Sequence, residues 1–192
     1  MVKVAITGGI GSGKSYICHL LEKRGISIYD CDNAAKRIMA TSVKIQAELN
    51  EVVGDNVFED GVLNKSVLTK YLLQCEENTN KINNIIHPAV ADDFVRSGYE
   101  WMECAILFSS GFDRLVNKVV CVVAPYDVRC DRIVKRDGIS REKAVEWINM
   151  QMPQEEVKSL SDFVIVNDGK SNVEQQIDDI LTSLDLPRCQ CL

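Results

Sequence analysis

The sequence lacks features that would direct it to a membrane or to nucleic acid. None of its apolar runs reaches the length of about 20 residues that a transmembrane helix requires. Basic residues are in deficit, because 22 lysines and arginines stand against 28 aspartates and glutamates, for a formal net charge of -6. Non-specific nucleic-acid binding needs a basic surface. We therefore expect no nucleic-acid partner and no membrane association.

Clustered cysteines are also missing. The chain has eight cysteines, but they form no C-x-x-C pair of the kind found in zinc sites, and no disulfide framework is evident in their spacing. Reduced, buried thiols are expected instead. The first strand-like run begins at Val2, which leaves no room for a signal peptide. These observations together predict a cytoplasmic protein.

A phosphate-binding motif is the most informative feature that is present. Gly8 to Ser15 read G-G-I-G-S-G-K-S, which fits the pattern G-x-x-x-x-G-K-[ST], and they directly follow the apolar run 2–7. Such a loop between a buried strand and a helix forms an anion-binding nest of backbone N–H groups, helped by the helix dipole. Lys14 would reach the β- and γ-phosphates and Ser15 would ligate Mg²⁺. The motif predicts binding of a nucleoside triphosphate.

Helical and strand-like segments alternate along the rest of the chain, which predicts an α/β fold with a parallel sheet. The runs assigned to strands are 2–7, 26–29, 101–108, 118–124 and 163–166. Between the second and third runs lies a long stretch of helical periodicity without a strand pattern. We expect a single domain with a core at 1–32, 99–124 and 160–185, a helical insert at about 33–98 and a helical lid at about 125–159.

Acidic residues lie near the edge where open parallel sheets bind their ligands. Asp30 and Asp32 come directly after the second strand. A carboxylate there could orient an attacking hydroxyl. However, Asp30 could equally cap the next helix, and Asp32 could simply complement the helix dipole. Glu103 is the only charge in the run 101–108, and it could either pair with Mg²⁺ or reach solvent at the strand edge.

Arginines recur along the helix expected after the fourth strand. Arg129, Arg132 and Arg136 are spaced so that they share one helix face, and Arg141 follows the next turn. A hinged helix pair with an arginine face could neutralise charge on a transferring phosphoryl group. The same pattern also fits an ordinary solvated face.

Two further polar residues allow more than one interpretation. His87 precedes Pro88 at an expected helix break, where a structural role competes with a ligand contact. Asn167 follows the last strand, where it could belong to a turn or contact a nucleotide base.

In their order along the chain, these segments resemble the dephospho-coenzyme A kinase family. The resemblance covers about residues 1–184 and rests on the loop 7–15, Asp30 to Asp32, His87-Pro88, the lid arginines, Gln151 and the ending 162–169. It implies the P-loop nucleoside-triphosphate hydrolase fold in its nucleoside-monophosphate-kinase form: a parallel five-stranded sheet flanked by helices, with a helical acceptor insert and a helical lid. The implied reaction is phosphorylation of the ribose 3′-hydroxyl of dephospho-CoA by ATP with Mg²⁺, giving CoA and ADP.

The resemblance also implies roles for particular residues. The ATP contacts would be Gly11, Ser12, Gly13, Lys14, Ser15, Tyr16, Arg132, Arg141 and Asn167. The catalytic residues would be Lys14, Asp32 and Arg136, with Asp32, Lys36 (or the adjacent Arg37) and His87 on the acceptor side. Ser15 and Glu103 would hold Mg²⁺. Ser109 departs from the glutamate that is common in the family, which leaves Glu103 as the nearby carboxylate. We expect a monomer or a weak homo-oligomer.

Two rival functions remain to be distinguished. Another P-loop small-molecule kinase, of the nucleoside-monophosphate or shikimate type, would share the loop and lid but not the His87-Pro88 insert or the Asn167 ending. A GTPase switch would need an N-K-x-D motif that reads guanine, and the stretch 117–120 reads N-K-V-V without the aspartate. The sequence therefore argues against a switch.

Overall fold

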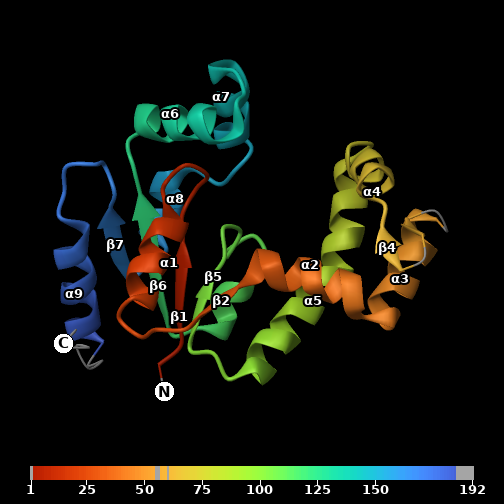
Figure 1. Ribbon diagram of the computed structural model, residues 1–192, viewed down its shortest axis with the longest axis horizontal. Coiled ribbons are helices and arrows are strands. Elements are labelled where there is room, and N and C mark those ends of the chain that lie inside the picture. The colour runs from red at the N-terminus through yellow and green to blue at the C-terminus, as the bar shows by residue number, and fades with distance from the viewer. Residues whose placement is uncertain (1, 55–56, 60, 185–192) are drawn as a thin grey trace. The chain divides into compact units, whose positions relative to one another are not determined.

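The computed structural model describes residues 2–54, 57–59 and 61–184 (Figure 1). The chain divides into two compact units. The first contains the residues up to Tyr29 together with those from Tyr99 onward, and the second is Asp30–Gly98.

A five-stranded sheet forms the centre of the nucleotide-binding part. Its strands are β1 (Val4–Thr7), β2 (Ile28–Asp30), β5 (Trp101–Glu103), β6 (Lys118–Val123) and β7 (Phe163–Val166). They lie in the order β2-β5-β1-β6-β7, and β1 pairs in parallel with both β5 and β6. All four residues of β1 are buried, as expected for a strand covered on both faces. The predicted parallel sheet is confirmed.

Helices α1 (Lys14–Glu22) and α9 (Val173–Ser183) cover one face of this sheet (Figure 1). Their buried residues Ile17 and Ile177 join Ile6 and Val120 of the strands in one apolar cluster. Burial of a large aliphatic side chain contributes roughly 1.5–3 kcal/mol. This cluster therefore fixes α1, and with it the end of the phosphate loop, against β1.

Three helices between β6 and β7 belong to the same unit: α6 (Tyr126–Asp137), α7 (Arg141–Asn149) and α8 (Gln154–Ser159). Gly138 ends α6 with a φ of 66°, and the Ser140 hydroxyl caps α7 by accepting from Lys143 N–H at 3.2 Å. Ile133 and Ile148 pack in a cluster that joins α6 to α7. The pair is thus held together by its own small core.

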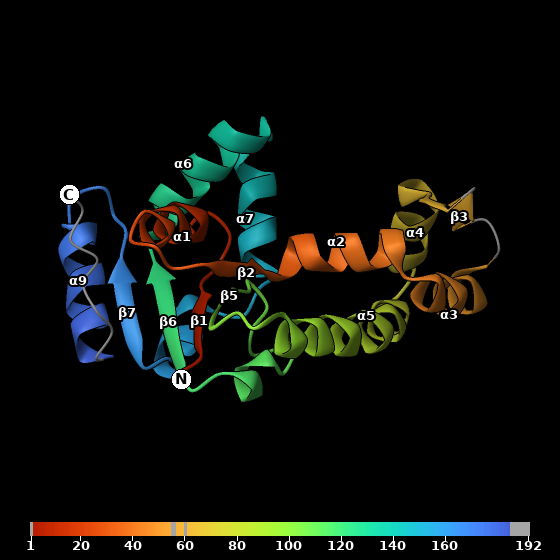
Figure 2. The ribbon, with the colours of Figure 1, turned by 60° about the horizontal axis from the view of Figure 1, so that its bottom comes forward.

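The second unit contains α2 (Cys31–Thr41), α3 (Val43–Val53), β3 (Phe58–Glu59), β4 (Val62–Leu63), α4 (Lys65–Leu72) and α5 (Glu76–Ser97). Figures 1 and 2 both show α2 beside the long helix α5. Ser42 and Asn64 begin α3 and α4 by accepting from backbone N–H groups three residues on. β3 and β4 form a small antiparallel pair, so the prediction of an insert without strands is wrong.

Two other boundaries differ from the predictions. The apolar run 101–108 is a strand only to Glu103, after which the chain turns toward a short 3₁₀ helix at Phe112–Leu115. Leu107 is nevertheless buried, and apolar periodicity does not distinguish such a packed turn from a strand. The helix break expected at His87-Pro88 is absent, because α5 runs through Pro88 without interruption.

An asparagine caps the closing helix. The Asn172 side chain begins α9 by accepting from Gln175 N–H at 3.1 Å. Ser171 is hydrogen-bonded to Asp168. The Asp168 carboxylate accepts from the Ser171 N–H at 2.8 Å and from the Ser171 hydroxyl at 3.2 Å. Ser171 therefore belongs to the preceding turn.

The cysteines in the described part of the chain show the reduced, buried state that the sequence predicts. These six cysteines are free thiols, and all except Cys75 are buried. Among the helices described, none couples enough length with enough apolar character to traverse a bilayer.

Candidate active site

The phosphate loop lies between the end of β1 and the first residue of α1. Gly13 begins α1 with a φ of 92°, a left-handed conformation that favours glycine. Lys14 Nζ donates to the carbonyl oxygen of Gly8 at 2.8 Å and so lies across the loop. Ser15 and Tyr16 are exposed in the first turn of α1. Tyr16 N–H donates to Gly13 O at 3.1 Å, so this N–H is engaged within the protein.

Arg132 and Asn167 hold the loop from its carbonyl side. Arg132 Nη1 donates to the carbonyl oxygens of Gly11 and Ser12 at 3.3 and 3.1 Å, and Nη2 donates to Asn167 O at 3.0 Å. The Asn167 side-chain amide donates to Ser12 O at 2.8 Å. A Cβ on Gly13 would lie 2.2 Å from Asn167 Nδ2. The structure thus brings these two predicted residues to the loop, where they contact its backbone.

Arg129 and Gln151 hold the loop at Ile10. Arg129 Nε donates to Ile10 O at 2.9 Å, and Ile10 N–H donates to Gln151 Oε1 at 2.7 Å. From the sequence, Arg129 is predicted only as one member of an arginine face that fits either a lid or a solvated surface, and Gln151 only as part of the family resemblance. The shared face of Arg129 and Arg132 on α6 was the signal that could have found the first. No local pattern marks Gln151, which lies between α7 and α8.

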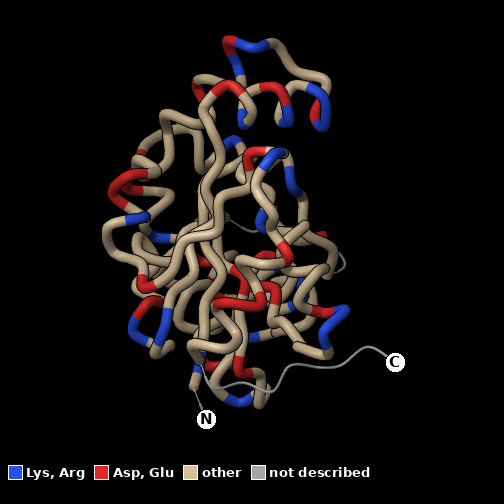
Figure 3. The backbone as a smooth tube through the Cα atoms, turned by 90° about the vertical axis from the view of Figure 1, so that its left-hand side faces the viewer, with Lys and Arg blue, Asp and Glu red and all other residues tan. Residues whose placement is uncertain are grey.

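The other two lid arginines pair with nearby carboxylates. Arg136 Nη2 lies 2.7 Å from Asp137 Oδ2. Arg141 lies 2.5 Å from Asp127 and 2.6 Å from Asp131, in both cases between a guanidinium nitrogen and Oδ1. Figure 3 shows basic and acidic residues interspersed along the uppermost helices. The arginine face of α6 is therefore divided: its first two members contact the loop, and Arg136 lies at the exposed end.

Glu103 lies close to α1. Burial, followed by the charge of Glu103 and a hydrogen bond to it, raises the pKa of the Cys18 thiol. Cys18 and Ser15 are three residues apart and share a side of α1, so Ser15 lies on the side of α1 that is close to Glu103. Among the described residues, no group of three or more His, Cys, Asp or Glu could hold a metal by itself. This donor set fits Mg²⁺, which keeps several waters and binds through one or two protein oxygens plus substrate phosphates.

The predicted acceptor residues belong to the second unit. Asp30 caps α2, because its Oδ1 accepts from Asn33 N–H at 2.8 Å, which confirms the capping alternative. Asp32 and Lys36 are both exposed, one helical turn apart on α2. Arg37 instead pairs with Asp93 of α5 at 2.5 Å. Lys36 therefore shares a helix face with Asp32, and the choice between Lys36 and Arg37 on the acceptor side stays a prediction.

His87 lies within α5 in the same unit. Burial lowers the pKa of its imidazole. A neutral imidazole can both donate and accept a hydrogen bond.

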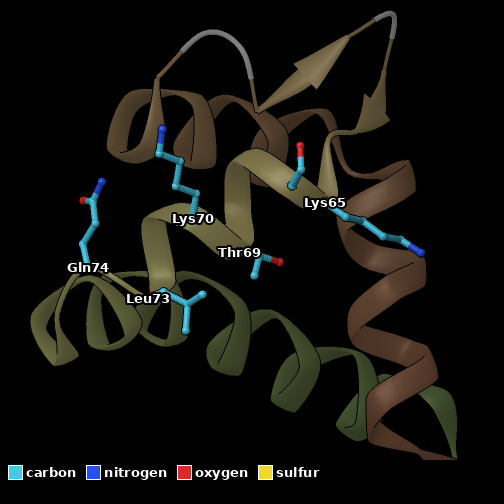
Figure 4. Close-up of a pocket in the computed structure, with 6 residues that line it drawn as sticks. Lys65, Thr69, Lys70, Leu73 and Gln74 are labelled. Atoms are coloured by element: carbon cyan, nitrogen blue, oxygen red, sulfur yellow. The ribbon is translucent and has the colours of Figure 1, made fainter. Parts of the chain in front are cut away.

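Of two hollows on the protein, one lies on the second unit and the other beside the phosphate loop. The larger, of about 520 Å³, is on the second unit and is lined by Lys65, Ser66, Thr69, Lys70, Leu73 and Gln74. Figure 4 shows Lys65 and Lys70 pointing to opposite sides, so polar groups do not converge there. A smaller hollow of about 180 Å³ is lined by Thr7, Gly9 and Gln151 beside the loop, together with Ser109. The smaller hollow is the one that belongs to the phosphate loop.

Comparison with known proteins decides the family. A family model described as dephospho-CoA kinase matches residues 2–173. The chain belongs to the dephospho-CoA kinase family. A dephospho-CoA kinase from Bacteroides fragilis is 40% identical over 95% of this chain and 93% of its own length. One from Porphyromonas gingivalis is 34% identical over 87% of this chain and 86% of its own. The chain is therefore a phosphotransferase, as the resemblance implied.

Solved structures give the same fold. TT1252 from Thermus thermophilus superposes with a TM-score of 0.78 at 27% identity and 96% coverage of both chains. Dephospho-CoA kinase from Campylobacter jejuni gives 0.66 at 19% identity, covering 95% of this chain and 96% of its own. Shikimate kinase from Bacteroides thetaiotaomicron gives 0.53 at 16% identity, covering 96% and 99%. The last two likenesses show the fold alone, and that fold is the predicted P-loop kinase fold.

Proposed function

We propose that this family member transfers the γ-phosphoryl group of ATP to the ribose 3′-hydroxyl of dephospho-CoA, giving CoA and ADP. The observation that carries the proposal is the polarity of the loop. Its carbonyl groups at Gly11 and Ser12 accept from Arg132 and Asn167. The N–H groups of Gly11 and Gly13 have no acceptor in the described part of the chain. A loop with bound carbonyls and available N–H donors at a helix N-terminus is suited to a phosphate anion.

The loop residues would bind and orient the triphosphate. Lys14 Nζ lies over the loop at Gly8 O, from which it would move onto the β- and γ-phosphate oxygens. Gly11, Ser12 and Gly13 would supply the cradle, and Tyr16 would contribute its exposed side chain. Ser15 and Glu103 would hold Mg²⁺, which when bound neutralises charge that develops on the phosphates.

The acceptor hydroxyl would be aimed by Asp32. Phosphoryl transfer passes through a loose transition state, so the carboxylate matters more for orienting the hydroxyl than for complete removal of its proton. Lys36, one turn away on α2, and His87 would bind the acceptor. Asp30 caps the helix, so capping does not occupy the Asp32 carboxylate.

Helices α6 to α8 would act as the lid, within residues 125–159. Arg136 and Arg141 would bring positive charge to the transferring group by exchanging their present carboxylate partners for phosphate oxygens. We also propose that the protein acts in the cytoplasm as a monomer or weak homo-oligomer, without nucleic acid or membrane.

A direct assay tests the reaction. The purified chain is given ATP and Mg²⁺ with dephospho-CoA, shikimate or a nucleoside monophosphate, and the products are identified by mass. We expect ADP and CoA to form from dephospho-CoA, with far slower turnover of the other acceptors. The kcat of the Lys14→Ala variant should fall by about 10²–10⁴-fold. Lys23→Ala, which alters an exposed lysine at the far end of α1, should match the wild type. Equal turnover of all three acceptors would contradict the proposal.

A further inference from the structure

Arg129 on α6 is a buried cation beside the phosphate loop. The residue is only 5% exposed, and burial lowers the pKa of its guanidinium. Within the part of the chain that the structure describes, no carboxylate pairs with it, and the one hydrogen bond of its side chain runs from Nε to Ile10 O. A buried charge is costly unless an opposite charge compensates it. This charge therefore needs an anion that the described residues do not supply.

The residue also takes part in fixing the loop backbone. Ile10 has both of its backbone polar groups bound by side chains from the region between β6 and β7. Its carbonyl accepts from Arg129 at 2.9 Å, and its N–H donates to Gln151 at 2.7 Å. The tip of the loop is held from both sides, so its conformation is set by protein contacts before any ligand contact is made.

Gly9 shows how closely the guanidinium fits against the loop. Its φ lies outside the left-handed region, so its backbone conformation does not demand glycine. A Cβ at this position would nevertheless lie 2.4 Å from Arg129 Nη2 and 3.2 Å from Gln151 Oε1. Moving Arg129 away would break its bond to Ile10. Gly9 is therefore small because Arg129 occupies the space of its side chain.

Gly11 gives the contrast. It has a φ of 79°, and a Cβ there would lie 2.7 Å from the Arg129 main-chain oxygen. Truncation of the Arg129 side chain removes neither the backbone strain nor that main-chain atom. Gly9 and Gly11 thus both neighbour Arg129, but only Gly9 depends on its guanidinium.

We propose that Arg129 is a positioning residue for the ATP phosphates, which with Gln151 fixes the loop at Ile10 and places an uncompensated positive charge beside it. Gly9 leaves the space in the loop that the Arg129 guanidinium occupies. The inference rests on the proposed use of ATP, but it concerns triphosphate binding and not the identity of the acceptor.

A double-mutant cycle tests the proposal. The Kd for ATP with Mg²⁺ and the separate KM values for ATP and dephospho-CoA are measured for Arg129→Ala, Gly9→Ala and the double variant. We expect each single change to raise the Kd and KM for ATP roughly tenfold or more, the effect of losing one charged hydrogen bond. The KM for dephospho-CoA should stay within about twofold. The double variant should bind ATP no more weakly than Arg129→Ala alone, because the added methyl enters space that the guanidinium has left.

The matched control is the cycle with Gly11→Ala, whose effect should add to that of Arg129→Ala. If Arg129→Ala does not fold, as judged by circular dichroism, Arg129→Lys takes its place in the cycle. Lysine keeps the positive charge but lacks the planar, forked guanidinium. Arg129→Lys should therefore raise the Kd for ATP less than Arg129→Ala does, and should still relieve part of the Gly9→Ala effect.

Some results would overturn the proposal. One is additivity of Gly9→Ala and Arg129→Ala in the Kd for ATP. Another is an Arg129 variant of lowered Tm that binds ATP with the wild-type Kd, because that would show a purely structural role. If the wild type binds ATP but transfers nothing to dephospho-CoA, the proposed function is contradicted. The Kd values for ATP in the double-mutant cycle would still test the role of Arg129.

Discussion

The side-chain amide of Asn167 donates to the carbonyl oxygen of Ser12 at 2.8 Å, across 155 positions of sequence. Both residues are buried. The contact joins the end of β7 to the loop after β1, two strands whose shared neighbour in the sheet is β6. Because parallel strands present their carboxyl ends at one edge, residues far apart in sequence meet at the phosphate loop.

This contact predicts the result of removing the amide. Asn167→Ala should raise the KM for ATP several-fold and lower the free energy of unfolding by about 1–3 kcal/mol, because a buried hydrogen bond is lost. The control is Asn172→Ala, which removes the cap of α9. It should lower the free energy of unfolding by about 1 kcal/mol and leave the KM for ATP unchanged. Chemical denaturation and steady-state kinetics measure the two effects. Equal KM values for the two variants would contradict the role of Asn167 at the loop.

Replacing Lys14 should affect activity far more than stability. Its ammonium donates to the carbonyl oxygen of Gly8 in a half-buried hydrogen bond, whose loss in Lys14→Ala should change Tm little. The kcat should fall by about 10²–10⁴-fold, because electrostatic stabilisation of the transferring group is lost. Thermal unfolding and turnover with dephospho-CoA are measured on the same preparation. A variant with normal kcat would exclude Lys14 from the chemistry.

Asp30 and Asp32 form a natural pair for separating structure from catalysis. Asp30→Ala should lower the free energy of unfolding by about 1 kcal/mol, because the N-cap of α2 is lost, while kcat stays within a few-fold. Asp32→Asn should leave stability nearly unchanged and lower kcat by about 10²-fold or more, because the hydroxyl is no longer aimed. Urea denaturation and kcat distinguish the two variants. The role of Asp32 would be ruled out by near-normal turnover of Asp32→Asn.

Local sequence was enough to predict the loop and most of the sheet. The G-x-x-x-x-G-K-[ST] motif needs a strand before it and a helix after it, and the structure has β1 and α1 at those places. The run 163–166 was predicted to the residue because a short apolar segment lies between polar turns. These features depend on neighbours in sequence, which a single sequence displays.

Features that depend on distant neighbours were not predicted from the pattern. The spacing of Arg129, Arg132 and Arg136 shows a shared helix face, but not that the first two contact the loop while Arg136 pairs with Asp137. Gln151 has no distinguishing local signal, because its partner Ile10 is 141 positions away. The hairpin β3–β4 has strands of only two residues, too short for an alternating pattern.

Asp162 gives a prediction about pH. Lys118 Nζ donates to its Oδ1 at 2.6 Å, and Val119 N–H donates to its Oδ2 at 2.9 Å. Burial acts to raise the pKa of this carboxyl, but the hydrogen bonds from Lys118 and Val119 outweigh it, so the pKa lies below its ordinary value. The carboxylate form is therefore favoured more in the folded state than in the unfolded state.

The sign of the pH effect follows from that shift. A lowered folded-state pKa contributes stability above the unfolded pKa of about 3.9, and this stability is lost as the pH falls through the folded pKa. Asp162→Asn keeps an acceptor for one donor but loses the charge. At pH 7 it should be less stable than the wild type by about 1 kcal/mol, and the difference should shrink as the pH is lowered below about 4.

Urea denaturation of both proteins at several values between pH 7 and pH 3 measures this difference. Asp92→Asn is the control for charge removal alone, because Asp92 is exposed on α5 and lies 3.8 Å from Arg96. An Asp162→Asn difference that stays constant across the range would show that the lost stability comes from packing at the start of β7. A difference that vanishes in acid would assign it to the carboxylate that joins β7 to β6.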